Sequence, residues 1–513
     1  SHFVSLAVML PATFCAGMTL PLITYALLGR GYGEKSIGTV YAANTLGGII
    51  GVLAALHLAM PALGLKGLIV FGAAIDIALG MALLWRRAQP ALATTAAGVI
   101  GVAALALTVA AVELDAYKMA SGVYRFGRLL SADSAEIRYH RDGKTATVDV
   151  VAHNSSGQLA LRTNGKTDAE IAIAPGESVG GDEPTMVMLG VLPVLFHPNA
   201  KSAAVVGMGA GVTTHTLLAT AQLERVDTIE IEPAMVEAAN HFRPRVEAAF
   251  SDPRSEIYID DAKAFFATRN SQYDIIVSEP SNPWVSGVAS LFSREFYALT
   301  RRYLREQGVF VQWLQLYEID PQLVASVMKA LSEHFSDYAI YAPLDWDLVV
   351  VATNGGRLPD VDAGTLRLAG VRQALERIGI RSARDLALRK LGHKAILAPL
   401  FDSFAVPANS DYFPVLDLNA ARTRFLGSTA HEFIALKRAP LPVLELLSGS
   451  KRNEIDTRVV ARDDLQITRA TQAALALRDF YINGNSPQTS SHIPAEIRKD
   501  MQLVSLLLKD CRL

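Results

Sequence analysis

A glycine-rich turn followed by acidic residues is the feature of this sequence most able to do chemistry. The turn contains Gly207, Gly209 and Gly211, and it lies directly after a short apolar run and before a segment with a helical pattern. Glycines at such a strand-to-helix turn let the backbone approach a bound nucleotide closely. Glu230 ends the next apolar run, where a carboxylate can bind both ribose hydroxyls. A tight structural turn with an unrelated surface acid is the alternative interpretation.

Three further carboxylates follow later runs of the same kind. Asp260 and Asp261 end one of these runs, and Glu279 ends the next. In an open parallel sheet, ligands bind beyond the carboxyl ends of the strands, so we expect these acids to share one crevice with Glu230. Carboxylates would repel the pyrophosphate of NAD and attract a positively charged ligand. The pattern therefore favours a sulfonium nucleoside over a dinucleotide.

Residues 189–314 resemble the catalytic domain of spermidine synthases. The stretch "VLPVLFHPNAKSAAVVGMGAGV" is similar to the family's entry into the nucleoside loop. "YDIIVSEPSNPWVSGVASLFSREFYALTRRYL" is similar to its catalytic loop and following helix, and "VQWLQL" to the next strand. The upstream "LRTNGKTDAE" and the apolar "GTVYAANTLGGIIGVLAALHLAMPALG" resemble the membrane-fused branch of the family. "NSDYFPVLDL" extends the resemblance weakly towards the C-terminus.

The resemblance implies a class I methyltransferase-like fold that transfers an aminopropyl group from decarboxylated S-adenosylmethionine to an amine. It implies that Glu230 binds the ribose, that Asp261, beside Asp260, binds the adenine amino group, and that Glu279 takes the place of the catalytic aspartate. A carboxylate base is useful because an amine with a pKa near ~10 is mostly protonated at neutral pH. The candidates for substrate binding are in the catalytic loop: Ser281, Asn282 and Trp284. For Trp284, a place in the core is the alternative.

The chain departs from the family pattern on the amine-binding side of the site. Ala210 stands where the family has an aspartate that binds the amine of the aminopropyl group, and Asn282 where it has an acid that binds the polyamine. Met186 and Val187 replace a glutamine or histidine near the nucleoside, and Glu279 is one methylene longer than aspartate. The sequence therefore predicts a retained nucleoside side and an eroded polyamine side.

Three functions remain open from the residues. The first is a membrane-anchored transferase of the spermidine synthase type. The second uses S-adenosylmethionine itself, for methyl transfer or cleavage, because the loss of an acid at Ala210 would accommodate the carboxylate of that molecule. The third is a transporter or sensor whose soluble part only binds a nucleoside or a polyamine, and Asp76, an acid within an apolar segment, supports it.

Alternating strands and helices must position these residues. Between residues 201 and 353, short Val- and Ile-rich runs alternate with helical segments, which predicts an α/β domain with a parallel, Rossmann-like sheet. Residues 136–163 alternate in strand fashion around a turn at Asp142-Gly143, which predicts a small antiparallel sheet. The sequence predicts four parts. They are transmembrane helices (1–115), a connector with the small β-sheet domain (116–188), the nucleoside-binding catalytic domain (189–353) and a helical C-terminal region (354–513).

The first part has the composition of membrane-spanning helices. At about 1.5 Å per residue, its apolar runs are long enough to cross a hydrocarbon core of ~30 Å. We expect four spans, at residues 4–28, 36–65, 67–85 and 91–112. Gly47 and Gly51 form a pair of small residues suited to close helix packing. Asp76 would lie near mid-membrane, hydrogen-bonded to His57 or Asn44, or serving transport.

The orientation of these spans is predicted by two arguments that disagree. Four spans place both ends of the segment on one side, and the basic residues of the far loops outnumber Lys66 on the near side: Arg30, Lys35, Arg86 and Arg87. The positive-inside rule therefore opposes a cytoplasmic C-terminal portion. The nucleoside chemistry requires a cytoplasmic C-terminal portion. We expect a multi-pass protein of the inner (plasma) membrane with a cytoplasmic catalytic domain.

Composition limits the partners. The formal net charge of -2 gives no reason to expect nucleic acid. The two cysteines, Cys15 and Cys511, exclude a disulfide framework, and no histidine pair has metal-ligand spacing, so no metal is expected. The absence of a basic n-region predicts no signal peptide. The expected partners are small-molecule nucleoside and amine substrates and membrane lipid, and the resemblance adds a homodimer.

Overall fold

The computed structural model describes residues 2–86, 91–173, 179–269, 271–387, 389–430 and 433. The chain divides into two compact units: Ser1–Asp115 with Asp142–Lys144, and Ala116–Arg141 with Thr145–Leu513. Arg87, Cys511 and the predicted helical region after residue 433 lie outside the described residues. The finer predicted boundaries, at residues 188 and 353, stay predictions.

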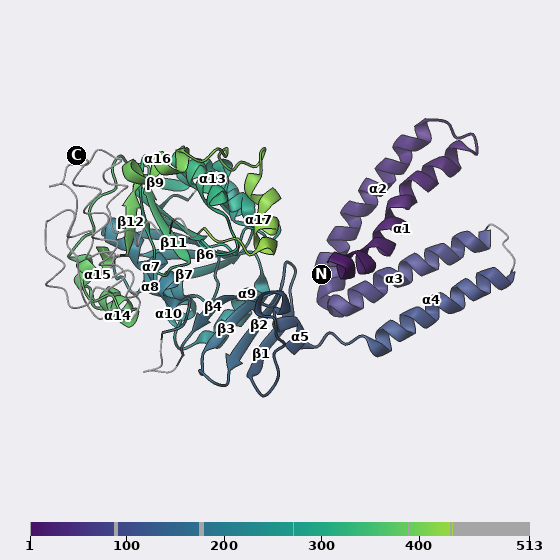
Figure 1. Ribbon diagram of the computed structural model, residues 1–513, viewed down its shortest axis with the longest axis horizontal. Coiled ribbons are helices and arrows are strands. Elements are labelled where there is room, and N and C mark those ends of the chain that lie inside the picture. The colour runs from purple at the N-terminus through teal and green to yellow at the C-terminus, as the bar shows by residue number, and fades with distance from the viewer. Residues whose placement is uncertain are drawn as a thin grey trace, which may run out of the picture. The chain divides into compact units, whose positions relative to one another are not determined.

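The first unit consists of long apolar helices. They are α1 (His2–Leu28), α2 (Lys35–Ala54), a π-helical turn (Ala55–Ala59), α3 (Met60–Arg86) and α4 (Ala91–Ala111). Helix α1 packs along α2, and α3 packs along α4 (Figure 1). By length and composition, three continuous helices could cross a membrane: Phe3–Leu28, Lys35–Arg86 and Leu92–Ala111.

The second of these helices is 52 residues long and contains a bend. At about 1.5 Å per residue it measures roughly 78 Å, more than twice a hydrocarbon core of ~30 Å. Gly64, near the start of α3, has a φ of 66°, which interrupts the helical conformation and divides the long helix into two segments. The four predicted spans therefore correspond to four helical segments, and their crossing of a membrane stays a prediction.

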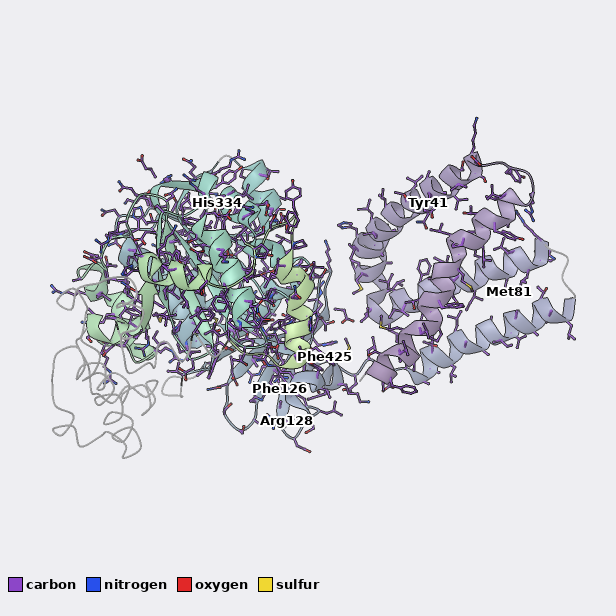
Figure 2. The ribbon with its side chains drawn as sticks, turned by 45° about the horizontal axis from the view of Figure 1, so that its top comes forward. Tyr41, Met81, Phe126, Arg128, His334 and Phe425 are labelled. Atoms are coloured by element: carbon purple, nitrogen blue, oxygen red, sulfur yellow. The ribbon has the colours of Figure 1, made fainter. Side chains whose placement is uncertain are left out.

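Glycines bring α3 and α4 together, but not those that the sequence analysis singled out. A Cβ atom on Gly98 would lie 2.9 Å from Cε of Met81, and one on Gly101 would lie 2.8 Å from Ile77 (Figure 2). A Cβ on Gly47 or Gly51 would meet nothing within 4 Å, so the predicted packing role of that pair is wrong. Both positions therefore have open space around them among the described residues.

The side chain of Asp76 does not make the predicted hydrogen bond to His57 or Asn44 within the described residues. Asp76 is exposed on α3. A carboxylate on an outward face cannot reach a partner on the neighbouring helix, and this prediction is therefore wrong for the structure described.

The second unit begins with a small sheet. After the short helices α5 (Ala116–Ala120) and α6 (Val123–Phe126) come β1 (Ala135–Asp142), β2 (Thr147–His153), β3 (Leu159–Thr163) and β4 (Lys166–Ile171), in the order β1-β2-β3-β4. Strand β3 pairs antiparallel with both β2 and β4. The predicted antiparallel sheet is confirmed and extends one strand further than predicted.

The main sheet has eight strands in the order β12-β10-β11-β9-β8-β5-β6-β7. The strands are β5 (Ser202–Val206), β6 (Arg225–Glu230), β7 (Ser255–Ile259), β8 (Tyr273–Ser278), β9 (Leu304–Gln315), β10 (Asp337–Tyr341), β11 (Asp347–Thr353) and β12 (Lys390–His393). Strands β5 to β9 pair in parallel, which confirms the predicted Rossmann-like sheet. Strand β11 runs antiparallel to β9 and β10.

Strand β12 comes from the region that was predicted to be helical. A short helix does start in this region, where Arg381 N donates to Asp385 Oδ2 at 2.9 Å and Asp385 N donates to Ser382 Oγ at 3.2 Å. The helix ends at Ala387, however, and the chain then pairs with β10. Tertiary pairing at a free sheet edge overrides the local helical pattern here.

Helices cover both faces of the sheet. They are α7 (Glu183–Phe196), α8 (Val212–Leu218), α9 (Pro233–Ala239), α10 (Ala248–Ser251), α11 (Ala262–Thr268), α12 (Arg294–Tyr303), α13 (Pro321–Ser332), α14 (Ala369–Arg377), α15 (Ala383–Ala387), α16 (Lys394–Asp402) and α17 (Val415–Leu426). Ala203 and Val205 of β5 join the core under α7, α8 and α14. Ala204 and Val206 join the core under α11, α12, α13 and α16. The alternation of side chains along a strand thus separates two cores.

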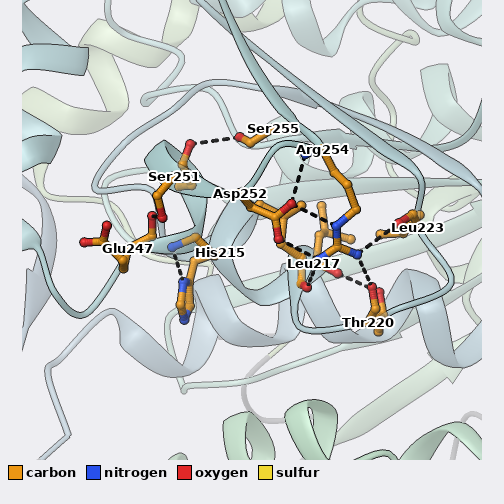
Figure 3. A network of polar contacts seen from close by, with 12 residues as sticks. His215, Leu217, Thr220, Leu223, Glu247, Ser251, Asp252, Arg254 and Ser255 are labelled. Atoms are coloured by element: carbon orange, nitrogen blue, oxygen red, sulfur yellow. Dashed lines mark hydrogen bonds and ion pairs between the residues drawn. The ribbon is translucent and has the colours of Figure 1, made fainter.

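A half-buried arginine fixes the helix that follows the glycine turn. The guanidinium of Arg254 donates to the carbonyl oxygens of Leu218, Thr220 and Leu223 at 2.7, 2.8 and 3.0 Å (Figure 3). It is held in place by Asp252 at 2.7 Å. A cation at the C-terminal end of a helix satisfies carbonyl groups that have no partner within the helix. Helix α8, and with it the turn at its start, is thereby tied to the loop before β7.

Candidate active site

A cavity of about 550 Å³ opens at the carboxyl ends of the parallel strands. The strand order reverses between β5 and β8, and a crevice forms at such a point because the connections leave on opposite faces. The cavity is lined by loops after β5, β6, β7 and β8, by the β3–β4 hairpin, and by the starts of α7 and β11. The predicted site residues in its wall are Gly207, Gly209, Glu230, Asp260, Asp261, Glu279, Ser281 and Trp284.

The glycine turn brings the end of β5 against the end of β8. Gly207 has a φ of 95°, and a Cβ atom there would lie 2.4 Å from the carbonyl oxygen of Glu279. Only glycine permits both the conformation and the contact. Gly209 has a φ of 49° with open space around it. Gly211 has a φ of 86° and caps α8 outside the cavity wall, so its contribution is to the turn.

Glu230 is buried at the end of β6 and anchors the turn. Its carboxylate accepts hydrogen bonds from the backbone N–H of Met208 and of Glu232, both at 2.9 Å. Burial raises the pKa of Glu230, and these two hydrogen bonds oppose the increase. Because the same carboxylate lines the cavity, it can hold the turn and also face the hydroxyls of a ribose.

The two aspartates after β7 lie at the more open part of the wall. Asp261 caps α11, since its Oδ1 accepts from the N–H of Ala264 at 2.9 Å. Asp260 Oδ1 accepts from the N–H of Asp261 at 2.9 Å, and Asp260 N donates to the carbonyl oxygen of Glu230. These contacts fix both carboxylates next to Glu230, as the sequence analysis predicted.

Glu279 lies in a second acidic group with Asp182 and Asp347, which we call the acid cluster. Thr213 Oγ1 donates to Glu279 Oε2 at 2.5 Å. Burial raises the pKa of Glu279 to about 8, the charges of Asp347 and Asp182 raise it further, and the hydrogen bond from Thr213 opposes this. With this pKa, Glu279 is mostly protonated at neutral pH.

The other two acids of the cluster have raised pKa values for the same reason. Burial raises the pKa of Asp182 to about 7, with the nearby charge of Asp347 adding to the effect. Burial raises the pKa of Asp347 to about 6 although Thr185 Oγ1 donates to it at 2.7 Å and Trp313 Nε1 donates to it at 3.1 Å. Three carboxyl groups that disfavour one another's charge attract a cation strongly.

A lysine in the cavity wall has its own partner. Lys166 Nζ donates to Asp168 Oδ1 at 2.7 Å, and Ser281 Oγ donates to the same oxygen at 3.2 Å. Burial alone would lower the pKa of Lys166, but the charge of Asp168 raises it overall. The charge of Lys166 lowers the pKa values of Asp182 and Asp347 but does not cancel the effect of burial, so the acid cluster is only partly compensated.

The catalytic loop places Asn282 behind the wall and Trp284 in it. Asn282 is fully buried, and its Nδ2 donates to Tyr317 Oη at 3.2 Å. Tyr317 lines the cavity and meets the ring of Trp284 edge to face, with centroids 6.3 Å apart. Asn282 therefore positions Tyr317 and does not line the cavity itself, whereas Trp284 is part of the wall.

Comparison with known proteins identifies the domain that carries this cavity. Residues 185–344 match the family model of the spermine/spermidine synthase domain. They include the glycine turn, Glu230, Asp261 and Glu279. These residues form a spermine/spermidine synthase domain. The recognition from sequence is thus confirmed.

The relatives of this synthase domain are transferases by name. A polyamine aminopropyltransferase of Nitrosomonas europaea is 32% identical over 157 residues, which are 30% of this chain and 48% of that protein. One of Bacillus subtilis is 28% identical over 154 residues, 30% of this chain and 55% of that protein. The chain spans about half the length of these curated relatives. A crystal structure of spermidine synthase from Thermotoga maritima is 20% identical, covers 48% of this chain and 87% of its own, and has a TM-score of 0.37.

Several charged residues of the wall lie outside the matched synthase domain. They are Lys166, Asp168, Asp182, Asp347 and Arg424. The sequence analysis missed all of them. Asp347 opens the run "DLVVVAT", and an antiparallel strand begins at the edge where parallel strands end. The strand direction could therefore have revealed Asp347, but the others follow from packing between distant segments.

Acids from outside the synthase domain also line this cavity, and the predicted erosion of the amine-binding side stays a prediction. Ala210 and Asn282 do lack the family's acids, and neither lines the cavity. Asp182 and Asp347 supply carboxylates to the same cavity from outside the synthase domain. Among the described residues, no group of three or more His, Cys, Asp or Glu side chains has the arrangement of a metal site.

Proposed function

We propose that the protein transfers an aminopropyl group from decarboxylated S-adenosylmethionine to an amine. The nucleoside would lie against the glycine turn, with its ribose at Glu230 and its adenine near Asp261. The observation that carries the proposal is the acid cluster in a cavity of the synthase domain, because it favours a sulfonium and an amine together.

The reaction would be an in-line displacement. The amine forms a C–N bond to the carbon next to the sulfonium, the C–S bond breaks, and its electron pair goes to sulfur as methylthioadenosine leaves. Before the attack, Glu279 takes a proton from the bound ammonium, so that the neutral amine supplies the electron pair for the C–N bond. This requires a deprotonated Glu279, and a cation bound next to it lowers the pKa of Glu279 from about 8 towards its ordinary range.

The experiment uses the full chain in detergent, with decarboxylated or intact S-adenosylmethionine and a pool of amines, and detects products by mass spectrometry. Methylthioadenosine together with a lengthened amine, both lost in Glu279→Gln, would support the proposal. Methylthioadenosine alone would indicate cleavage. Tight binding of nucleoside without product, unchanged in Glu279→Gln, would indicate a sensor or transporter and would contradict the transferase.

Use of intact S-adenosylmethionine is the second candidate. It is favoured by Ala210, which is buried in the turn after β5 and removes the acid that the family has there. S-adenosylmethionine carries a carboxylate that such an acid would repel. Formation of S-adenosylhomocysteine from intact donor would move the assignment to methyl transfer.

We also propose that the first unit anchors the protein in the inner (plasma) membrane as a multi-pass segment. Its helices expose large apolar side chains, including Phe3 and Trp85 at 82% and Leu92 at 83% of their surface. The substrates of the proposed reaction are cytoplasmic metabolites, so the synthase domain would face the cytoplasm. The family resemblance adds a homodimer, which sedimentation of the detergent-solubilised chain would test.

A further inference from the structure

One cation in the cavity wall does not fit a site built for polyamines. Arg424 of α17 lines the cavity. Of the Lys and Arg residues that the structure places in the wall, the other is Lys166, which is paired with Asp168 at 2.7 Å. Arg424 lies outside the matched synthase domain, so the family resemblance assigns it no role.

The charge of Arg424 is only partly compensated. Its Nε lies 3.7 Å from Glu318 Oε2, and Nη1 of Arg125 lies 3.6 Å from the same oxygen. Both distances exceed that of a good hydrogen bond, and two guanidinium groups share one carboxylate. Arg424 Nε, Arg125 Nη1 and Glu318 Oε2 are all buried without a hydrogen-bond partner. The group therefore keeps one excess positive charge at the wall.

Aromatic rings hold Arg424 in this position. Its guanidinium lies over the rings of Trp284 and Tyr124, at 5.1 and 5.6 Å from their centroids. Phe425, the next residue on α17, stacks on Tyr124 with centroids 6.2 Å apart. Stacking on aromatic faces orients the planar guanidinium, and an oriented guanidinium can bind a carboxylate with two hydrogen bonds.

The backbone around Arg424 is anchored to the segment after β9. Thr423 Oγ1 donates to the carbonyl oxygen of Glu318 at 3.1 Å, and Thr429 pairs with Tyr317 in an isolated antiparallel bridge. Ala430 N donates to the carbonyl oxygen of Leu316 at 2.8 Å. Because Tyr317 and Arg424 both line the cavity, this anchorage fixes the cation relative to the wall.

We infer that the amine acceptor carries a carboxylate, which Arg424 binds while the amine faces the acid cluster. The inference rests on the proposed aminopropyl transfer and names its acceptor class as amino acids or ω-amino carboxylates. A simple diamine would bring a second ammonium group against the excess positive charge, which is unfavourable in a partly buried site. An amino carboxylate has an ammonium group for the acid cluster and a carboxylate for Arg424.

The same carboxylate chemistry has a second source, because intact S-adenosylmethionine also carries a carboxylate. The two sources differ in which molecule Arg424 recognises. If the donor is the source, selectivity for intact over decarboxylated donor depends on Arg424. If the acceptor is the source, selectivity among acceptors depends on it.

The test measures kcat/KM of the full chain in detergent with acceptors that differ in one group. The pairs are matched in length, from β-alanine with 1,3-diaminopropane, through 4-aminobutyrate with putrescine, to 6-aminohexanoate with 1,6-diaminohexane. Each is assayed with both donors. The variants are Arg424→Gln and Arg424→Lys, and the matched control is Arg422→Gln, an exposed arginine of the same helix. Binding of each acceptor in the presence of methylthioadenosine is measured calorimetrically.

The expected result is a preference of the wild type for the amino carboxylate of at least one pair. Arg424→Gln should reduce that preference about tenfold or more, mainly through KM, as expected for the loss of a charge-assisted hydrogen bond. Arg424→Lys should restore part of it, and Arg422→Gln should leave it unchanged. The calorimetric affinities should follow the same order.

Two outcomes would overturn the inference in distinguishable ways. In the first, diamines are used as well as amino carboxylates or better, and Arg424→Gln does not change this. That result is compatible with aminopropyl transfer but rejects amino carboxylates as the acceptor class. In the second, Arg424→Gln changes only the selectivity for intact over decarboxylated donor. Arg424 would then bind the carboxylate of the donor and not one of the acceptor. If no acceptor turns over, the proposed function fails, and calorimetric binding of amino carboxylates that is insensitive to Arg424→Gln rejects the inference separately.

Discussion

At the scale of single residues, the state of Glu279 depends on what binds beside it. Its pKa of about 8 keeps it mostly protonated at neutral pH, and Asp182 and Asp347 contribute to that value. A sulfonium or ammonium group would stabilise the carboxylate and favour loss of the proton. Binding and base activation are therefore one event in this cavity.

Binding of a cationic ligand should release protons at neutral pH. Calorimetry of decarboxylated S-adenosylmethionine at pH 7, in two buffers of different ionisation enthalpy, should give a positive number of protons released, because Glu279 and Asp182 have pKa values of about 8 and 7. Neutral methylthioadenosine should release fewer. Glu279→Gln should reduce the release, and a release that is the same in this variant would contradict the assignment.

The stability of the protein should also report the raised pKa of Glu279. Its folded-state pKa of about 8 exceeds the ordinary value of about 4.3 for glutamate, so the folded state binds more protons between these values. The free energy of unfolding therefore decreases as pH rises from about 4.5 through 8. Glu279→Gln removes this contribution. The Tm of the variant minus the Tm of the wild type should therefore increase as pH rises from 5 to 8. Glu306→Gln, at an exposed position, is the control and should show no such trend.

At the scale of elements, the contact between the β5 turn and the end of β8 determines whether the cavity forms. Gly207→Ala combines a positive φ with a Cβ only 2.4 Å from a backbone oxygen, whereas Gly209→Ala combines a positive φ with open space. We expect Gly209→Ala to cost about 1 kcal/mol from backbone strain, and Gly207→Ala to cost more and to abolish nucleoside binding. Chemical denaturation and calorimetric binding measure the two effects. Equal costs for the two variants would show that the close contact is unimportant.

A buried ion-pair network ties the C-terminal region to the start of α7. Glu183 is fully buried and accepts hydrogen bonds from Arg245 and from Arg377 of α14. Arg377→Gln would leave Glu183 with one cation, and we expect it to cost about 2 kcal/mol of stability. Arg372→Gln, on the same helix, breaks only an exposed pair with Glu376 and should cost less than about 0.5 kcal/mol. Because Asp182 precedes Glu183, Arg377→Gln should also weaken ligand binding.

The parallel sheet and its acids could be predicted from sequence, because each was signalled by a few neighbouring residues. The glycine turn, Glu230 and Glu279 follow short strands directly. Strand β12 and the place of Asp347 could not be predicted in this way, since pairing at the far sheet edge decides both. Arg424 lies in the cavity because α17 packs against the segment after β9, and no local pattern indicates that contact.

At the scale of the whole molecule, the two units differ in what they need around them. Among the described residues, the buried apolar side chains begin at Ala120, so α1–α4 contribute none of them. The second unit has its own cores on both faces of the sheet. We therefore expect only the first unit to need an apolar surrounding.

Removal of residues 1–115 should therefore leave a soluble, folded fragment. The fragment that begins at Ala116 should melt cooperatively without detergent, within a few degrees of the full chain, and should keep its affinity for methylthioadenosine. The full chain should aggregate when detergent is removed. A fragment that fails to melt cooperatively would show that the first unit stabilises the second. Differential scanning calorimetry and light scattering measure these properties.

The cavity wall draws residues from Thr145 to Arg424, and this has a consequence during synthesis of the chain. At about 5–20 residues per second, a ribosome needs roughly 15 to 55 s to pass from the first of these positions to the last. Until then Glu279 and its neighbours belong to an unfinished wall, open to water and unable to concentrate a substrate. A nascent chain therefore gains no help from its ligand while it folds. Only a chain translated past α17 can be rescued by substrate, so truncated products should remain unprotected from proteolysis whatever the supply of nucleoside.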